Sequence, residues 1–262
     1  MAGSPSFCNP LRQAWQEGRQ TVNGWLAIPS PVTAEVMAHQ GWDSLTFDMQ
    51  HGLVDYTDTI PMLAAISTTP TVAMARIPWL EESIIMKMLD AGCHGIICPM
   101  VNNAQDAARF VRICQYPPEG IRSFGPIRTG LYAGPEYYKT ANGEVLKIAM
   151  VETREAVDNL ESILSVEGLS GVYVGPADLS MAYGCTPKFD QEERPVVEAI
   201  EKIVATAREK GKFVGVHNLT PGYALRMAKL GANFVTIASD LRLMTAAAAD
   251  AVKTFRSGLE SQ

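Results

Sequence analysis

The chain has 262 residues, a formal net charge of −6 and a hydrophobic fraction of 47%. These values are typical of a globular domain with a large core, and the lack of a basic patch argues against nucleic-acid binding. No apolar run approaches the roughly 18 residues of a membrane span, and no secretory signal pattern opens the chain, so we expect a cytoplasmic protein without membrane contact. The five cysteines form no C-x-x-C pair, which indicates free thiols rather than a zinc or redox site.

Short apolar strands alternate with amphipathic helices along the chain. Four strands are preceded by a glycine, a residue that ends helices at little steric cost: Gly41, Gly92, Gly211 and Gly231. We expect strands at 22–28, 44–50, 71–77, 95–101, 146–152, 171–176, 212–217 and 234–239. We expect helices at 31–40, 57–67, 81–91, 103–115, 154–165, 195–210, 221–230 and 241–256.

Eight such alternations predict one (β/α)₈ TIM barrel over residues 1–262, with a short helix near 11–17. One connection, at about 116–145, is unusually long. Loops of this length in compact domains are commonly functional, so we expect either a mobile cover or an element that reaches a neighbouring subunit.

Polar residues gather at the predicted carboxyl ends of the strands, where (β/α)₈ barrels carry their active sites. They are Asp48, Gln50, His51, Arg76, Glu152, Asp178, His217, Asn218, Ser239 and Asp240. Two of them, Glu152 and Asp178, are carboxylates suited to Mg²⁺, Mn²⁺ or Co²⁺. Paired carboxylates also serve glycoside hydrolysis, but the tight turn GPAD around Asp178 favours a small carboxylate ligand.

Arg76 offers a charged fork of donors for an oxyanion, and His51 can move a proton near neutral pH. Strand alternation predicts that Asp48 points away from His51. The position of Asp90 at a helix end suggests no role by itself. Among the lysines only Lys139 and Lys188, both in loops, could enter the barrel, which favours a metal over a Schiff base.

Several segments resemble the metal-dependent class II pyruvate aldolases, the HpcH/HpaI family. They are FDMQHG (47–52), PMV (99–101), YPPEGIRSFGP (116–126), MVETREAVDNLESILSVEGLSGVYVGPADLS (150–180) and GANFVT (231–236). The resemblance extends from about Gly24 to Met244. It implies a barrel of the phosphoenolpyruvate/pyruvate type and a homo-oligomer, a hexamer built as a trimer of dimers, with sites near subunit interfaces.

The resemblance also implies a role for individual residues. Glu152 and Asp178 correspond to the metal ligands, His51 to the base and Arg76 to the arginine that stabilises the enolate. Asp90 corresponds to the acid that raises the basicity of this histidine. The resemblance thus gives Asp90 a role that its position at a helix end does not suggest. The pyruvate carboxylate is expected to meet backbone N–H groups around Gly175, Pro176, Ala177 and Asp178. Met150 stands where better-known members carry a substrate-binding glutamine, so substrate preference can differ.

These residues predict reversible cleavage of 4-hydroxy-2-oxo acids to pyruvate and an aldehyde through a metal-stabilised enolate. Arg122, Arg128 and Tyr132 are candidates for contacting the far end of the aldehyde. One alternative is a related lyase or decarboxylase that acts on oxaloacetate, through the same enolate, or on a similar 2-oxo dicarboxylate. A second is a non-catalytic protein that binds a dicarboxylate, which nothing in the sequence favours.

Overall fold

A closed barrel of eight parallel strands forms the centre of the computed structural model, which describes residues 7–260. Each strand pairs with the next in sequence, and β8 closes the ring by pairing with β1. The strands are β1 (Thr21–Leu26), β2 (Ser44–Asp48), β3 (Val72–Arg76), β4 (Gly95–Cys98), β5 (Leu146–Val151), β6 (Gly171–Val174), β7 (Phe213–Asn218) and β8 (Phe234–Ser239). The predicted TIM barrel is confirmed.

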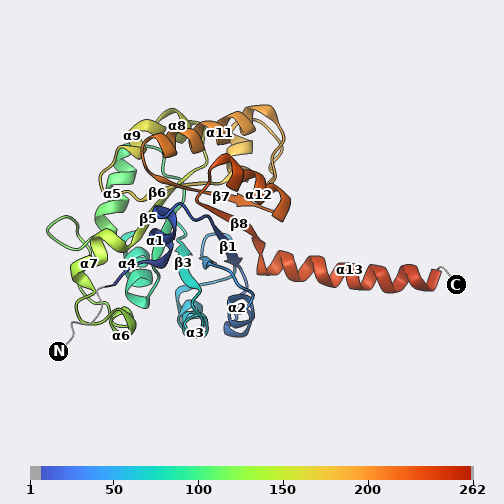
Figure 1. The fold of residues 1–262 in the computed structure, drawn as a ribbon, viewed down its shortest axis with the longest axis horizontal. Coiled ribbons are helices and arrows are strands. Elements are labelled where there is room, and N and C mark those ends of the chain that lie inside the picture. Colours follow the sequence, from blue (N-terminus) through green and yellow to red (C-terminus); the bar gives the residue numbers. More distant parts are fainter. Residues whose placement is uncertain (1–6, 261–262) are drawn as a thin grey trace.

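Helices surround the barrel and connect its strands (Figure 1). They are α1 (Pro10–Gln16), α2 (Pro31–Ala38), α3 (Tyr56–Ile66), α4 (Glu82–Ala91), α5 (Ala104–Cys114), α6 (Thr129–Ala133), α7 (Tyr138–Glu144), α8 (Arg154–Asp158), α9 (Leu160–Leu164), α10 (Pro176–Ala182), α11 (Arg194–Glu209), α12 (Pro221–Leu230) and α13 (Asp240–Glu260). Helix α11 shows why these segments fold as predicted. Its buried residues Val196, Ile200, Ile203 and Ala207 recur at helical spacing and form the face toward the barrel.

Most strands end earlier than their apolar runs predict. The fourth ends at Cys98 rather than residue 101, because Met100 adopts a left-handed backbone with φ of 55°. The sixth ends at Val174, because Pro176 starts helix α10. The helix expected at 154–165 is divided into α8 and α9 at Asn159. These early ends leave short polar turns above the barrel.

The long connection folds against the body of the protein and is not a loose cover. It contains α6 and α7, and the Arg122 side chain within it is fully buried. The Thr129 hydroxyl donates a hydrogen bond to the carbonyl of Leu89, at the end of α4 that precedes β4. The connection is therefore attached near the amino-terminal end of the strands, opposite the end where (β/α)₈ enzymes carry out catalysis.

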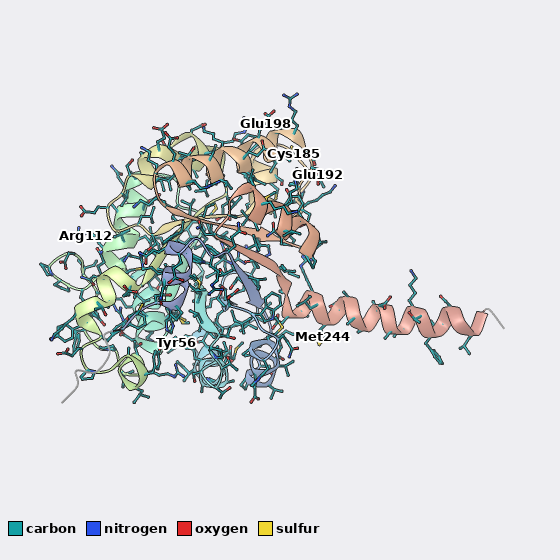
Figure 2. The ribbon with its side chains drawn as sticks, in the orientation of Figure 1. Tyr56, Arg112, Cys185, Glu192, Glu198 and Met244 are labelled. Atoms are coloured by element: carbon teal, nitrogen blue, oxygen red, sulfur yellow. The ribbon has the colours of Figure 1, made fainter. Side chains whose placement is uncertain are left out.

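The last helix, α13, extends away from the barrel as a single rod (Figure 1). Its side chains project outward along its length, with Met244 near the barrel (Figure 2). Large apolar residues on it are exposed, namely Leu241, Leu243, Met244, Val252, Phe255 and Leu259. Among the helices of residues 7–260, none combines the length and apolar character needed to cross a bilayer.

Candidate active site

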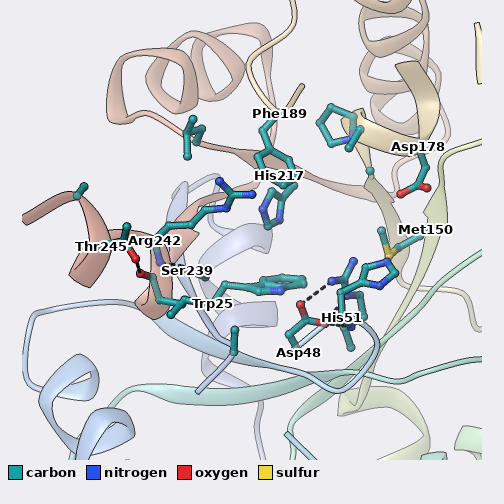
Figure 3. A pocket seen from close by; sticks show the side chains of 18 of the residues that line it. Trp25, Asp48, His51, Met150, Asp178, Phe189, His217, Ser239, Arg242 and Thr245 are labelled. Carbon is teal, nitrogen blue, oxygen red and sulfur yellow. Dashed lines mark hydrogen bonds and ion pairs between the residues drawn. The ribbon is translucent and has the colours of Figure 1, made fainter. Parts of the chain in front are cut away.

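A pocket of about 770 Å³ opens at the carboxyl ends of the strands (Figure 3). It gathers most of the polar strand-end residues that the sequence singled out, together with apolar and aromatic neighbours. Its lining includes Trp25, Asp48, His51, Arg76, Met150, Gly175, Pro176, Ala177, Asp178, Phe189, His217 and Arg242. Among the described residues that line it, none is a lysine, which agrees with the expectation against a Schiff base.

Arg76 and Asp48 form a buried, two-pronged ion pair on neighbouring strands. Arg76 Nε donates to Asp48 Oδ1 at 3.0 Å, and Arg76 Nη2 donates to Oδ2 at 2.7 Å. Burial opposes ionisation of Asp48, yet the Arg76 charge and the hydrogen bonds that the carboxylate accepts together outweigh burial and hold the pKa of Asp48 below its usual value. The guanidinium carbon also lies 5.0 Å from the centre of the Trp25 ring. The pair fixes the guanidinium and leaves Nη1 without a protein partner in residues 7–260.

The Asp48 carboxylate also orders the turn that carries His51. Asp48 Oδ1 accepts the backbone N–H groups of Gln50 and His51 at 3.2 and 3.1 Å. The expectation that Asp48 points away from His51 is wrong, because β2 ends at Asp48 and strand alternation no longer applies beyond it, so both residues line the pocket. The His51 imidazole stays exposed at the pocket. Asp48 thus links the arginine and the histidine through one carboxylate.

Glu152 follows β5 and is 2% exposed. Burial raises its pKa to about 7, and the negative charge of Asp178 adds to this rise, while the Met100 N–H opposes it. Met100 N–H donates to Glu152 Oε1 at 2.7 Å, and Met100 has a left-handed backbone with φ of 55°. The charge of Asp178 thus disfavours ionisation of Glu152, and a cation bound beside both carboxylates would offset this repulsion.

Asp178 lies in the first turn of α10 and is exposed to the pocket. Gly175 precedes this helix and Pro176 begins it, so the N–H groups of Ala177 and Asp178 have no partner within the helix. Such groups can bind a carboxylate. Among residues 7–260 no group of three or more His, Cys, Asp or Glu is arranged to hold a metal. A cation at Glu152 and Asp178 therefore needs substrate oxygens or waters as further ligands, as Mg²⁺ commonly takes.

Comparison with known proteins decides the family. The model of the HpcH/HpaI aldolase/citrate lyase family matches residues 22–247. The chain belongs to this family. It is 41% identical to a hydroxypyruvate/pyruvate aldolase of Rhizorhabdus wittichii, over 95% of this chain and 99% of the relative. It is 35% identical to a 5-keto-4-deoxy-D-glucarate aldolase of Klebsiella pneumoniae, over 94% of this chain and 98% of the relative.

A crystal structure of an HpcH/HpaI aldolase/citrate lyase family protein from Burkholderia cenocepacia superimposes with a TM-score of 0.89. The two chains are 28% identical, over 95% of this chain and 99% of the other. The family and the aldolase class predicted from the sequence are thus confirmed by homology. The relatives are named for different substrates, so the substrate of this HpcH/HpaI member is open.

Asp90, assigned to the family's acid by resemblance, does not contact His51 within one chain. It lies near the end of α4, and its carboxylate accepts a hydrogen bond from Arg122 Nη2 at 2.7 Å. Burial raises the pKa of Asp90, although Arg122 opposes the rise. The role of Asp90 as the acid that tunes His51 therefore stays a prediction.

The three candidates for the far end of the aldehyde do not line the pocket of their own chain. Arg122 is bound to Asp90 and to Tyr137. Arg128 donates to the carbonyl of Ala91 and to Ser67, and Tyr132 donates to the carbonyl of Gly92. These contacts surround the carboxyl end of α4, and they hold the long connection in place without a substrate.

The pocket wall also contains residues that sequence reasoning missed. Trp25 lies inside β1, Phe189 precedes α11, and Arg242 lies on α13. His217, which sequence reasoning did find, contacts two of them, with ring centres 5.0 Å from Trp25 and 4.7 Å from Phe189. A search for polar residues at the ends of strands does not detect aromatic residues, and it does not detect a charged residue on a helix.

The close packing of Gly175 yields a prediction. A Cβ atom at this position would lie 2.5 Å from Glu152 Oε2 and 3.0 Å from Met150 Cε. We expect Gly175→Ala to displace the carboxylate and to weaken Mn²⁺ binding at least tenfold, measured by titration calorimetry. Gly222→Ala is the matched control, because a Cβ atom there meets no atom within 4 Å. Equal Mn²⁺ affinity in both variants would contradict the placement of the ion.

Proposed function

We propose that this chain is a divalent-metal-dependent pyruvate aldolase, which cleaves a 4-hydroxy-2-oxo acid to pyruvate and an aldehyde. The observation that carries the proposal is the shared pocket of His51, Arg76 and Asp178, next to buried Glu152. Membership of the HpcH/HpaI family supports the pyruvate aldolase class. The metal, the residue roles and the substrate are our proposals.

Glu152 and Asp178 are proposed to hold Mg²⁺, Mn²⁺ or Co²⁺. Buried Glu152, whose ionisation is disfavoured by the charge of exposed Asp178, fits such an ion, and Gly175 carries no Cβ atom that would press on Glu152 Oε2. When bound, the ion supplies Lewis-acid stabilisation of charge on the 2-oxo acid. The N–H groups of Ala177 and Asp178 are proposed to bind the pyruvate carboxylate. Met150 presents an apolar wall at the position of the family's glutamine, so this chain lacks that amide contact.

Arg76 is proposed to stabilise the enolate. Its fork is already oriented by Asp48, so little reorganisation accompanies the appearance of negative charge on the substrate oxygen. His51 is proposed as the base that takes the proton of the 4-hydroxyl group, after which the bond between carbon 3 and carbon 4 breaks. The released enolate then takes a proton at carbon 3 and becomes pyruvate.

The proposal is tested by pyruvate release from a panel of 4-hydroxy-2-oxo acids and from oxaloacetate. The reaction is coupled to lactate dehydrogenase, with EDTA and with Mg²⁺, Mn²⁺ or Co²⁺ added back. We expect cleavage that EDTA removes and metal restores. Decarboxylation of oxaloacetate without cleavage of any hydroxy acid under any metal would replace the aldolase with the related decarboxylase.

Copies of the chain are proposed to assemble into a homo-oligomer, with a trimer of dimers as the expected form. The exposed apolar residues of α13, such as Phe255 at 69% exposure, support this, because a free helix rarely keeps such a face in water. An Asp90 of a neighbouring copy is proposed to approach His51, since Asp90 binds Arg122 within the described part of its own chain. Light scattering should give a multiple of the 28.4 kDa chain mass. A monomer at micromolar concentration would contradict both points.

A further inference from the structure

The pocket has a second charged end besides the one with Glu152 and Asp178. One face of α13 lines it with Arg242, Thr245, Ala246 and Ala249, which recur at helical spacing. Figure 3 shows the Arg242 side chain reaching from α13 toward His217, on the side of the pocket opposite Asp178. A molecule that contacts both Asp178 and Arg242 therefore spans the pocket.

The Arg242 guanidinium has no anionic partner in the described part of the chain. The centre of the Phe189 ring lies 4.9 Å from the guanidinium carbon. The other arginine of the pocket, Arg76, is neutralised by Asp48. Arg242 is thus the one lining cation of residues 7–260 without a counter-charge.

The wall beside Arg242 is neutral. Burial lowers the pKa of His217 to about 3, and the charges of Arg76 and Arg242 act in the same direction against the opposing charge of Asp48. His217 is therefore uncharged at neutral pH, and its Nδ1 lies 3.1 Å from the Tyr173 hydroxyl. The rings of Phe189 and Trp25 pack against this neutral imidazole, and Arg242 is exposed to the pocket beside them.

We propose that Arg242 selects aldehydes that carry a carboxylate at the end remote from the reacting carbon. This inference rests on the proposed aldolase function, because it assumes that pyruvate occupies the end with Glu152 and Asp178. A guanidinium binds a carboxylate through two parallel hydrogen bonds, so a charged aldehyde gains contacts that a neutral one of equal length does not.

The test compares succinate semialdehyde with butanal, two four-carbon aldehydes that differ in the terminal group, in aldol addition to pyruvate by the metal-loaded protein. We expect the wild type to favour succinate semialdehyde. In Arg242→Gln the ratio of the two kcat/KM values should fall by roughly 10- to 100-fold, the usual loss for a charged hydrogen bond. Arg242→Lys should restore part of the ratio, since it keeps the charge without the fork.

Arg256→Gln is the matched control, because it removes the same charge from an exposed position of the same helix. An unchanged ratio in Arg242→Gln, or an equal fall in Arg256→Gln, would overturn the inference. Exchange of the pyruvate methyl protons with D₂O by the wild type separately tests the proposed function. If exchange is absent, calorimetry with succinate still decides: weaker binding only in Arg242→Gln supports the anion contact, and equal binding in both variants rejects it.

Discussion

Glu152→Gln should lower the rate of 4-hydroxy-2-oxo acid cleavage by roughly 10³-fold or more, because a missing metal ligand removes several kcal/mol of transition-state stabilisation. Asp178→Asn should have a similar effect. Calorimetry with Mn²⁺ should show weakened or absent binding in both variants. The loss of activity should not come from unfolding. Burial raises the pKa of Glu152 to about 7 and disfavours its charged form, so a neutral glutamine should be tolerated at this position.

The raised pKa of Glu152 also sets how the stability of the metal-free protein changes with pH. A carboxyl group whose pKa is raised by folding binds its proton more tightly in the folded state, so it lowers stability as the pH rises from about 4.5 to about 7. Replacing Glu152 by neutral glutamine should therefore keep or raise the melting temperature of the metal-free protein at pH 8. Glu155→Gln, on the exposed surface of α8, is the matched control and should keep both Mn²⁺ binding and cleavage. Normal Mn²⁺ affinity in Glu152→Gln would remove the proposed site.

Arg76→Met should lower kcat by roughly 10²- to 10³-fold, the usual cost of losing one donor to a developing oxyanion. It should also lower stability by roughly 3–5 kcal/mol, because Asp48 is left buried without its partner. The two effects have different origins. Thermal unfolding measures the second effect, and steady-state cleavage under saturating metal measures the first.

The double variant Asp48→Asn, Arg76→Met separates the two effects. It removes the unpaired buried charge, so most of the lost stability should return. Cleavage should stay low, because the donor to the enolate is still absent. Recovery of kcat together with stability would mean that Arg76 only supports the fold, and its proposed role at the substrate would then fail.

The barrel and much of its rim could be predicted from the sequence because both depend on local patterns. Apolar strands that alternate with amphipathic helices are compatible with few fold topologies. In a barrel, the polar residues at the carboxyl ends of the strands all lie at one rim. Arg76 and Asp178 were found in this way, and the pocket contains both. The same reasoning misjudged Asp48, since it assumed that β2 continues to His51, whereas the strand ends at Asp48.

Other features depend on contacts that no local pattern records. The left-handed backbone of Met100 follows from tertiary structure and not from the preference of a methionine. Arg122 was expected near a substrate, but its position is set by a contact with Asp90 more than thirty positions away. Arg242 enters the pocket from a helix that leaves the barrel, so only the three-dimensional arrangement reveals it.

The central claim is that Glu152 and Asp178 hold a divalent ion with which this chain converts pyruvate to its enolate. The most direct measurement is NMR of pyruvate in D₂O with the wild-type protein, which follows loss of the methyl proton signal. The account predicts exchange with Mg²⁺, Mn²⁺ or Co²⁺ present, no exchange after EDTA treatment, and no exchange by Glu152→Gln with metal. Exchange that continues unchanged in EDTA would contradict it.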